Sequence, residues 1–169
     1  MVLVFPSIEL KNAAWEYRKE YIDFGETHIH GSSNLLQVPD YETWLKKILW
    51  NRTECTPEWV TGEVYFAMID NMIVGTIAIR HYLNKILLNS GGHIGYGIRP
   101  TERHKGYGKQ MLALALEKCR EIGLKRVLVT CDKENIASTK TAMSMGAVFE
   151  NEYLDENGDA VSRFWIDLS

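Results

Sequence analysis

The sequence predicts one α/β domain built on a mixed central sheet, and three observations support this. Apolar residues recur at helical spacing in several segments, and short β-branched runs lie between those segments. Two pairs of strand-like runs are joined by tight turns, at Asp70-Asn71 and Asn157-Gly158, as in β-hairpins. The segment from Ile94 to Thr130 reads strand, helix, strand, which is typical of a parallel crossover. The sheet should therefore contain both antiparallel and parallel neighbours.

The first half of the chain is expected to supply three strands and two helices. Ser7 can cap a helix that ends at Gly25, and Asp40 is a suitable N-cap for the next helix. A polar loop that contains glycine separates these helices, and a second loop with Pro57 follows them. The expected elements are a strand at 2–5, a helix at 10–24, the polar loop at 25–35, a helix at 40–49, the second loop at 51–62 and a hairpin of strands at 64–69 and 73–80.

The second half begins with a strand that carries Gly95 and Gly97 in its middle. Glycine weakens a strand, so its presence suggests a bulge or another group close to the backbone. Gly123 and Gly146 end the two helices that follow. The expected elements are a strand at 94–98, a helix at 105–122, a strand at 127–130, a helix at 136–145 and a hairpin of strands at 148–154 and 160–168. The complete order is β-α-α-β-β-β-α-β-α-β-β.

The junction between the strand at 94–98 and the next helix is a glycine loop. Backbone N–H groups at the start of a helix lack partners and the helix dipole adds positive charge there, so such a loop can bind phosphate. Gly106 and Gly108 have no Cβ, which would let a pyrophosphate approach the backbone. A turn that only opens a helix would show the same glycines. The charged side chains expected at the rim are Arg103, His104, Lys105 and Lys109.

Length and charge limit the class of protein. The chain has 169 residues, 46% of them apolar and 24% charged, which fits a single globular domain over residues 1–169. The formal net charge of −3 argues against a nucleic-acid binder. Residues 99–140 carry +5 and the remainder carries −8, so a basic segment surrounds the glycine loop. This segment suits a polyanionic ligand, and the acidic remainder would attract a cationic amine.

The cysteines and the apolar runs bear on the compartment. Cys55, Cys119 and Cys131 form no C-x-x-C pair, so we expect reduced thiols in a cytoplasmic protein. Cys131 has no activating base in the sequence and is expected to be structural rather than nucleophilic. No apolar run reaches the length of a membrane span, and the N-terminus lacks the basic region of a signal peptide. We therefore expect no membrane partner.

Two histidines lie two residues apart in the polar loop at 25–35. On a strand, His28 and His30 would share a face and could bind a metal, but no third ligand is spaced to help them. We therefore interpret this segment as a solvated loop without a metal. Together with Glu26, the two histidines could still contact a substrate.

The spacing Arg103-x-x-Gly106-x-Gly108 at a strand-to-helix junction resembles the acyl-CoA signature of the GNAT superfamily of N-acetyltransferases. The order of strands and helices matches that superfamily over most of the chain, and Asn135-x-x-Ser138 resembles its second motif. The resemblance implies a GNAT-like mixed central sheet with splayed middle strands, acetyl-CoA as co-substrate and no metal. The residues that it assigns to CoA are Gly97 and Ile98 on the strand, Arg103, His104, Lys105, Gly106, Tyr107, Gly108 and Lys109 in the loop, and Asn135 and Ser138 in the second motif.

The same resemblance implies a mechanism in which an amine attacks the thioester directly within a ternary complex. The backbone N–H near Ile98 would polarise the carbonyl oxygen. The amine must lose a proton, and the family's base position corresponds to His93, with Glu63 as a second candidate. A competing interpretation has His93 bonded only to backbone. The tyrosine that protonates the leaving thiolate in many members corresponds to Ala142, so water or Tyr153 would have to replace it.

Other functions fit the sequence to different degrees. A dinucleotide-binding fingerprint would need a third glycine after Gly108, and a P-loop would need Ser or Thr after Lys109. A CoA-binding sensor or partner module without turnover is a serious alternative, favoured by Ala142. A protein-modifying acetyltransferase differs only in its acceptor and would need an open groove, whereas the loop at 25–35 could close over a small molecule. We predict an N-acetyltransferase for a small-molecule primary amine, either a monomer or a homodimer.

Overall fold

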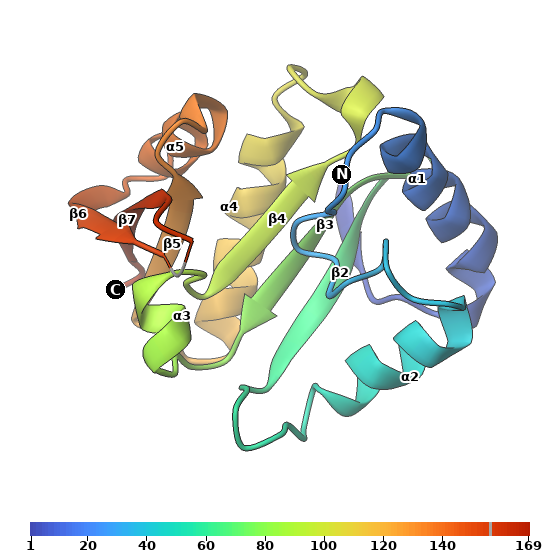
Figure 1. The fold of residues 1–169 in the computed structure, drawn as a ribbon, viewed down its shortest axis with the longest axis horizontal. Helices are drawn as coiled ribbons and strands as arrows, with labels where there is room; N and C mark the ends of the chain where they lie inside the picture. Colours follow the sequence, from blue (N-terminus) through green and yellow to red (C-terminus); the bar gives the residue numbers. More distant parts are fainter. Residues whose placement is uncertain (156) are drawn as a thin grey trace.

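A computed structural model describes residues 1–155 and 157–169 of the chain. It has a seven-stranded sheet in the order β1-β2-β3-β4-β5-β7-β6 with helices on both faces (Figure 1). Glu156, which belongs to the turn expected at 155–159, lies outside the described residues. The strands are β1 (Val2–Val4), β2 (Gly62–Ile69), β3 (Met72–Arg80), β4 (Ile94–Ile98), β5 (Arg126–Asp132), β6 (Val148–Leu154) and β7 (Ala160–Asp167). The helices are α1 (Lys11–Asp23), α2 (Tyr41–Trp50), α3 (Lys85–Asn89), α4 (Tyr107–Glu121) and α5 (Ile136–Met143).

The two middle strands are joined at one end only. β4 and β5 are the parallel pair, and the one register pair between them is Ile94 with Val129. Every other pair of neighbouring strands is antiparallel. Beyond Ile94 the two strands diverge toward the end of the sheet where α4 begins (Figure 1). The predicted mixed sheet with splayed middle strands is confirmed.

Each face of the sheet has its own hydrophobic core. α4 passes behind β4 in Figure 1 and contributes an apolar stripe at helical spacing that packs on buried residues of β3, β4 and β5. α1 and α2 cover the other face, where Trp44 stacks on Phe66 at 5.7 Å between ring centroids. The buried residues of the α4 stripe are Met111, Leu112, Ala115, Leu116 and Cys119.

The loop between α1 and α2 is seated directly on β3 and β4. Thr76 Oγ1 donates to the carbonyl oxygen of His30 at 2.9 Å. Gly31 has φ +74°, and a Cβ there would collide with Gly95 O and lie 2.8 Å from Thr76 O. A Cβ on Gly97 would lie 3.0 Å from His30 O. Gly97 is therefore explained by this loop, which packs against the strand where the sequence suggested a bulge or a ligand, whereas a Cβ on Gly95 would meet no atom closer than 3.6 Å.

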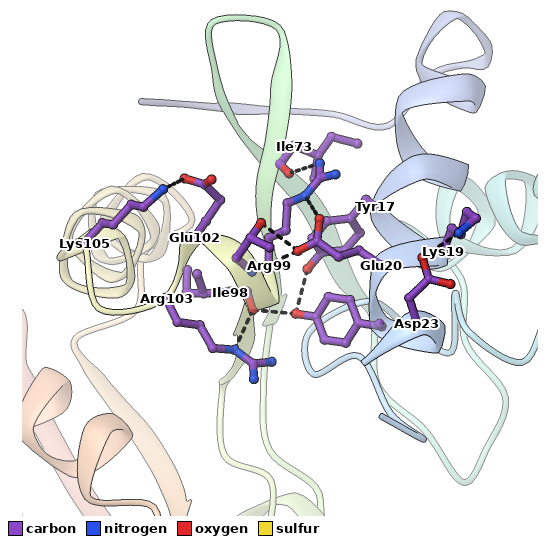
Figure 2. A network of polar contacts seen from close by, with 12 residues as sticks. Tyr17, Lys19, Glu20, Asp23, Ile73, Ile98, Arg99, Glu102, Arg103 and Lys105 are labelled. Carbon is purple, nitrogen blue, oxygen red and sulfur yellow. Dashed lines mark hydrogen bonds and ion pairs between the residues drawn. The ribbon is translucent and has the colours of Figure 1, made fainter. Parts of the chain in front are cut away.

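A polar network ties α1 to the end of β4 (Figure 2). Glu20 Oε2 accepts from Arg99 Nε at 2.6 Å, and its Oε1 accepts from both Thr101 N and Thr101 Oγ1. Burial would raise the pKa of Glu20, but the hydrogen bonds from Thr101 and Arg99 outweigh it and hold that pKa below its ordinary value. Nearby, Tyr21 Oη donates to Ile98 O at 2.8 Å. The tip of β4 is thus held by α1 through side chains.

Local geometry corrects some predicted boundaries. The expected first helix is a 3₁₀ turn at Ile8–Leu10 followed by α1, and the Ser7 side chain does not cap it. α4 begins at Tyr107, not at Lys105, because Gly106 takes the left-handed conformation with φ +79° as its N-cap. The turn at Asp70-Asn71 has positive φ at both residues, as the predicted hairpin requires.

Candidate active site

The divergence of β4 and β5 leaves a cleft of about 320 Å³ at the centre of the molecule. Polar side chains from β5, α5 and the α1–α2 loop line this cleft, in contrast to the apolar cores on the two faces of the sheet. Asn135 and Ser138, both predicted from the second motif, reach it. The other residues used below that line it are His28, His30, Gly31, Arg80, Gly91, Gly95, Tyr96, Thr130, Cys131, Asp132 and Asp155.

Three of these side chains form a hydrogen-bonded row across the cleft. Tyr96 Oη and Ser138 Oγ are 3.0 Å apart, and the Cys131 thiol donates to Ser138 Oγ at 3.1 Å. Burial raises the pKa of Tyr96 and the pKa of Cys131, so both hold their protons near neutral pH. The row joins β4, α5 and β5. Sequence reasoning missed Tyr96, because nothing local marks a strand tyrosine as facing a cleft.

Asn135 and Ser138 are linked through the start of α5. The Asn135 Oδ1 atom accepts from Ser138 N at 3.0 Å, which makes Asn135 the N-cap of the helix. This cap fixes the first turn of α5 against the cleft, so the Ser138 hydroxyl meets Tyr96 and Cys131. Ala142, one turn later, is fully buried in the core with α4.

The glycine loop lies at the far end of the same divergence, where α4 begins. Gly106 faces open space, since a Cβ there would meet no atom within 4 Å. His104, before it, also has a positive φ of 63°. The first turn of α4 contains no acidic residue and no side chain caps it, so the N–H groups of Tyr107, Gly108 and Lys109 point outward. The start of α4 is therefore open and uncapped, as a polyanion site would require.

Two of the predicted loop cations are already engaged. Lys105 Nζ pairs with Glu102 at 2.9 Å. Arg103 Nη1 lies 2.7 Å from Oε1 of Glu26, just after α1. Arg103 Nε donates to Ile98 O at 3.1 Å (Figure 2). The hydrogen bond that Arg103 donates to Glu26 raises the pKa of Arg103. In this arrangement Arg103 braces the loop against α1 and β4, so it supports the loop from behind rather than from its rim.

The backbone of Ile98 is oriented toward the gap between the strands. Arg99 N donates to Val74 O at 2.8 Å, which sets the alternation of the antiparallel ladder between β3 and β4. The N–H of Ile98 therefore points away from β3. Its carbonyl oxygen accepts from both Tyr21 and Arg103, so both acceptor positions of that oxygen are used.

His93 is bonded to the neighbouring strand. Its Nδ1 accepts from Leu128 N at 2.9 Å, and its own backbone N–H donates to Leu128 O at 2.8 Å. Burial, with a smaller contribution from Arg80, lowers the pKa of His93 to about 4. A neutral imidazole that accepts at Nδ1 carries its hydrogen on Nε2, so neither nitrogen has a free lone pair for a proton. The geometry matches the competing interpretation of a backbone-bonded histidine.

Glu63 and Tyr153 stand apart from the cleft. Glu63 Oε2 accepts from Tyr65 Oη at 2.6 Å, and its other oxygen faces Arg52 at 3.4 Å. This carboxylate thus has two partners near the edge of the sheet. Tyr153 lies on the exposed edge strand β6 and is absent from the described lining of the cleft.

His28 and His30 both line the cleft, with 4.6 Å between their ring centroids. Burial and the neighbouring His28 lower the pKa of His30, while Asp132 and Glu26 oppose that shift. Both side chains are exposed, as expected of a solvated loop, and the loop's seat on β4 also places them beside the cleft. Across residues 1–155 and 157–169, no group of three or more ligating side chains could hold a metal ion.

A larger hollow of about 560 Å³ adjoins the cleft on the face covered by α2. Its floor is formed by parts of β2 and β3, and its walls come from the α1–α2 loop, α2 and the segment after α2. His28, Gly31 and Arg80 line both the hollow and the cleft. The two spaces therefore meet at these three residues, and a molecule in the hollow can reach a group held in the cleft. The walls include Lys47, Trp50, Glu58 and Trp59.

Solved structures with the same fold cover almost the whole chain. The putative acetyltransferase yncA from Salmonella typhimurium, solved with acetyl-CoA, is 12% identical with a TM-score of 0.69, over 99% of this chain and 94% of its own. The microcin C7 self-immunity acetyltransferase MccE, solved with acetyl-CoA and AMP, is 16% identical with a TM-score of 0.70, over 98% and 91%. A Salmonella typhimurium acetyltransferase that modifies the N-terminal serine of ribosomal protein L7/L12 is 14% identical with a TM-score of 0.68, over 99% and 94%.

The sequence itself was also compared with curated proteins and with family models. No curated protein matches it. Among the described residues, no helix is both long enough and apolar enough to span a bilayer. The family model for the acetyltransferase (GNAT) family matches residues 29–147, which include β4, the glycine loop and the second motif. On that match, the chain belongs to the GNAT acetyltransferase family.

Proposed function

We propose that this protein transfers the acetyl group of acetyl-CoA to a primary amine of a small molecule, by direct attack within a ternary complex. The observation that carries the proposal is the β4–β5 divergence, which has the open N-terminus of α4 at one end and the hollow at the other. The pyrophosphate and the thioester lie at opposite ends of the pantetheine arm of acetyl-CoA. The pyrophosphate needs the open helix N-terminus, and the thioester needs to lie beside the hollow that holds the acceptor. Holding donor and acceptor together in this way removes most of the entropic cost of their encounter.

The donor would be held mainly by backbone. The N–H groups at the start of α4, beside Gly106 and Gly108, suit the pyrophosphate, and we propose His104 and Lys109 as the side chains at its rim. Lys105 would have to leave Glu102 to do so. The N–H of Ile98 faces the gap and suits either a pantetheine amide or the thioester oxygen. Asn135 and Ser138 would border the thiol end of the arm.

His30 is the base that we propose for the amine. It lines the cleft beside the hollow, and its lowered pKa leaves it neutral at pH 7 with a lone pair available. His93 and Glu63 are less suited, because Leu128 N occupies the Nδ1 atom of His93 and Tyr65 and Arg52 occupy the carboxylate of Glu63. Asp132 lines the same cleft and would attract the ammonium form of the substrate.

The row of Tyr96, Ser138 and Cys131 is the acid that we propose in place of the missing tyrosine at Ala142. The three side chains carry three S–H or O–H hydrogens, and the two hydrogen bonds within the row use two of them. One hydrogen is left to point into the cleft. A thiolate formed there would accept it, and the row could pass a proton along its length.

The small-molecule acceptor is favoured by the walls of the hollow. The seated α1–α2 loop, α2 and the segment with Trp59 surround it on several sides, as a compact substrate requires. An acceptor that is a protein terminus would need to thread into the same space. The alternative of a CoA-binding module without turnover is weakened by the proton-transfer groups that line the cleft.

The test compares two tryptophan variants at opposite ends of α4. Gly106 and Gly123 both have positive φ, +79° and +86°, and a Cβ at either position would meet no atom within 4 Å. Gly106→Trp and Gly123→Trp therefore carry similar backbone strain, but only the first blocks the start of the helix. Calorimetric titration should show acetyl-CoA binding by the native chain and by Gly123→Trp, and loss of binding by Gly106→Trp. If both variants bind acetyl-CoA equally well, the donor site does not lie at the start of α4.

Turnover is then measured with a panel of small primary amines. Release of free CoA that depends on the amine supports the transferase. Tight acetyl-CoA binding with no turnover for any amine or any peptide N-terminus would favour the sensor module. Turnover with peptide N-termini alone would show that the acceptor is a protein and not a small molecule.

A further inference from the structure

Arg80, the last residue of β3, sends its guanidinium group over β4 to the place where the cleft and the hollow meet. Its Nη1 donates to Gly91 O at 2.7 Å and to Gly92 O at 3.0 Å. The Nη2 atom lies 3.6 Å from the position that a Cβ on Gly95 would take. That is an ordinary van der Waals distance, so the guanidinium lies against the face of the strand at Gly95.

This guanidinium has no acidic partner within the described part of the chain. The ten ion pairs found there do not include Arg80. Burial lowers its pKa to about 10, which shows how far the charge is removed from water. A partly desolvated charge without a counter-ion is costly, and an anion bound there would offset that cost.

Part of the guanidinium remains free to bind. The two carbonyl oxygens engage Nη1, and no hydrogen bond of the described residues uses Nε or Nη2. The buried side-chain polar atoms without a partner in that part of the chain are His81 Nε2 and Arg163 Nε, and Arg80 is not among them. Its free N–H groups therefore keep contact with the space in the hollow and the cleft. A planar guanidinium with two free N–H directions matches an oxyanion.

The groups around this space complement a molecule with both signs of charge. Asp132, Asp155 and His30 line the cleft, and Glu58 and Glu63 line the hollow. Trp59 lies 5.9 Å from Arg80 Cζ and, with Trp50, gives the hollow an apolar wall. An ammonium would lie toward the carboxylates and His30, an oxyanion would lie on Arg80, and an apolar substituent would extend into the hollow.

We infer that Arg80 forms an oxyanion subsite in the acceptor pocket and that the acceptor is an amino carboxylate, a small molecule whose primary amine lies a few atoms from a carboxylate. This inference rests on the proposed acetyltransferase function and narrows its acceptor. It also revises the expectation of a purely cationic amine, which was based on the acidic remainder of the chain. The carboxylate orients the molecule so that its amine faces the cleft.

The experiment uses matched pairs of acceptors with the whole protein. L-phenylalanine is compared with 2-phenylethylamine and L-leucine with 3-methylbutylamine, so each pair differs by the carboxylate, and aminomethylphosphonate serves as a phosphorus oxyanion. The enzymes are the native chain, Arg80→Gln, Arg80→Lys and the control Arg120→Gln, whose side chain pairs with Glu117 on the surface of α4. Acetyl-CoA binding is measured by calorimetry for every variant.

The native chain should use each amino acid with kcat/KM at least about tenfold above its decarboxylated partner, as loss of a charged hydrogen bond predicts. Arg80→Gln should remove that preference, chiefly through KM, by lowering kcat/KM for the amino acids at least about tenfold more than kcat/KM for the decarboxylated amines. Arg80→Lys should keep part of the preference, and Arg120→Gln should keep all of it. If kcat/KM for aminomethylphosphonate exceeds kcat/KM for the amino acids, the amino-carboxylate assignment is wrong and the subsite binds phosphorus oxyanions instead.

Other results would also overturn the inference. Equal use of both members of a pair by the native chain would do so, as would an equal loss for both members in Arg80→Gln. If acetyl-CoA binds but no member of the panel is acetylated, the amino-carboxylate acceptor is wrong while the donor site stands. If acetyl-CoA does not bind to the native chain, the proposed function itself fails, so the two failures are distinguishable.

Discussion

Glu20 on α1 and Arg99 at the end of β4 form an ion pair, with 2.6 Å between Oε2 and Nε, and both side chains are largely buried. The same carboxylate accepts two hydrogen bonds from Thr101 (Figure 2). This pair therefore links the first helix to the strand that ends at the glycine loop. Its removal affects both the stability of the chain and the position of that loop.

Glu20→Gln should lower the free energy of unfolding by about 2–3 kcal/mol, because it leaves the Arg99 guanidinium without a charged partner in a half-buried place. Glu16→Gln on the same helix is the control, since Glu16 is exposed and takes part in none of the ion pairs among the described residues. Urea denaturation measures both. Equal stability of the two variants would show that the network contributes nothing.

The stability of the native chain should fall as the pH drops below about 4.5, the ordinary pKa of glutamate. The pKa of Glu20 is lower in the folded state than in the unfolded state, so the unfolded state takes up the proton first. The stabilisation is present above the unfolded pKa and is lost as the pH falls through the folded pKa. Urea midpoints between pH 3 and pH 7 should therefore change less in Glu20→Gln than in the native chain. Parallel curves for the two proteins would contradict this.

Gly31→Ala should be far more harmful than Gly25→Ala, although both glycines have similar φ, +74° and +71°. At Gly25 a Cβ meets nothing within 4 Å, so only the backbone strain of about 1 kcal/mol is expected. At Gly31 the Cβ would collide with the backbone of Gly95, so the loop must lift from β4. Thermal unfolding and acetyl transfer are both measured. Similar loss in both variants would mean that the loop's seat is unimportant.

Tyr96→Phe should lower kcat by about tenfold to a hundredfold with little change in the KM for acetyl-CoA, in the range of general-acid effects. The ring is kept while the hydrogen bond to Ser138 is lost. Tyr153→Phe, on the exposed strand β6, should retain full activity. Loss of activity in Tyr153→Phe with full activity in Tyr96→Phe would instead make Tyr153 the acid. Thioesters with a less basic leaving thiolate should suffer less in Tyr96→Phe.

His30→Gln should reduce kcat/KM by about tenfold to a hundredfold at pH 7–8. Because the pKa of His30 is below its ordinary value of 6.5, the native base is deprotonated in that range and becomes protonated only at lower pH. The ratio of native to variant activity should therefore be constant above pH 7 and fall toward one below that lowered pKa. His93→Asn, whose side-chain oxygen can still accept from Leu128 N, should follow the native profile.

Features set by neighbouring residues were predictable from the sequence. The Asp70-Asn71 hairpin, the glycine that opens α4 and the Asp40 cap of α2 depend on backbone conformations a few residues long. The mixed sheet was predictable from the order of strands and helices along the chain. These patterns were also enough to indicate the family, because its motif lies within one strand-to-helix junction.

The roles of single side chains were not predictable, because register and distant packing decide them. His93 lies three residues before Tyr96, yet one bonds the backbone of β5 and the other faces α5. Arg103 turns to Glu26, which is 77 residues away in sequence, and not to the loop rim. Arg80 carried no signal in the sequence, since a strand-end arginine is ordinary. Gly97 was noticed in the sequence, but the loop that approaches it lies far earlier in the chain.

The single register pair between Ile94 and Val129 divides the sheet into a leaf of four strands and a leaf of three. Few hydrogen bonds cross this seam, so the leaves can part without unfolding, and amide hydrogens that face the seam should exchange with solvent sooner than those inside either leaf. A ligand seated in the seam would act as a substitute strand and close that opening. When the donor is bound, amide hydrogens of the two leaves should therefore exchange together, and the leaves should unfold as one cooperative unit.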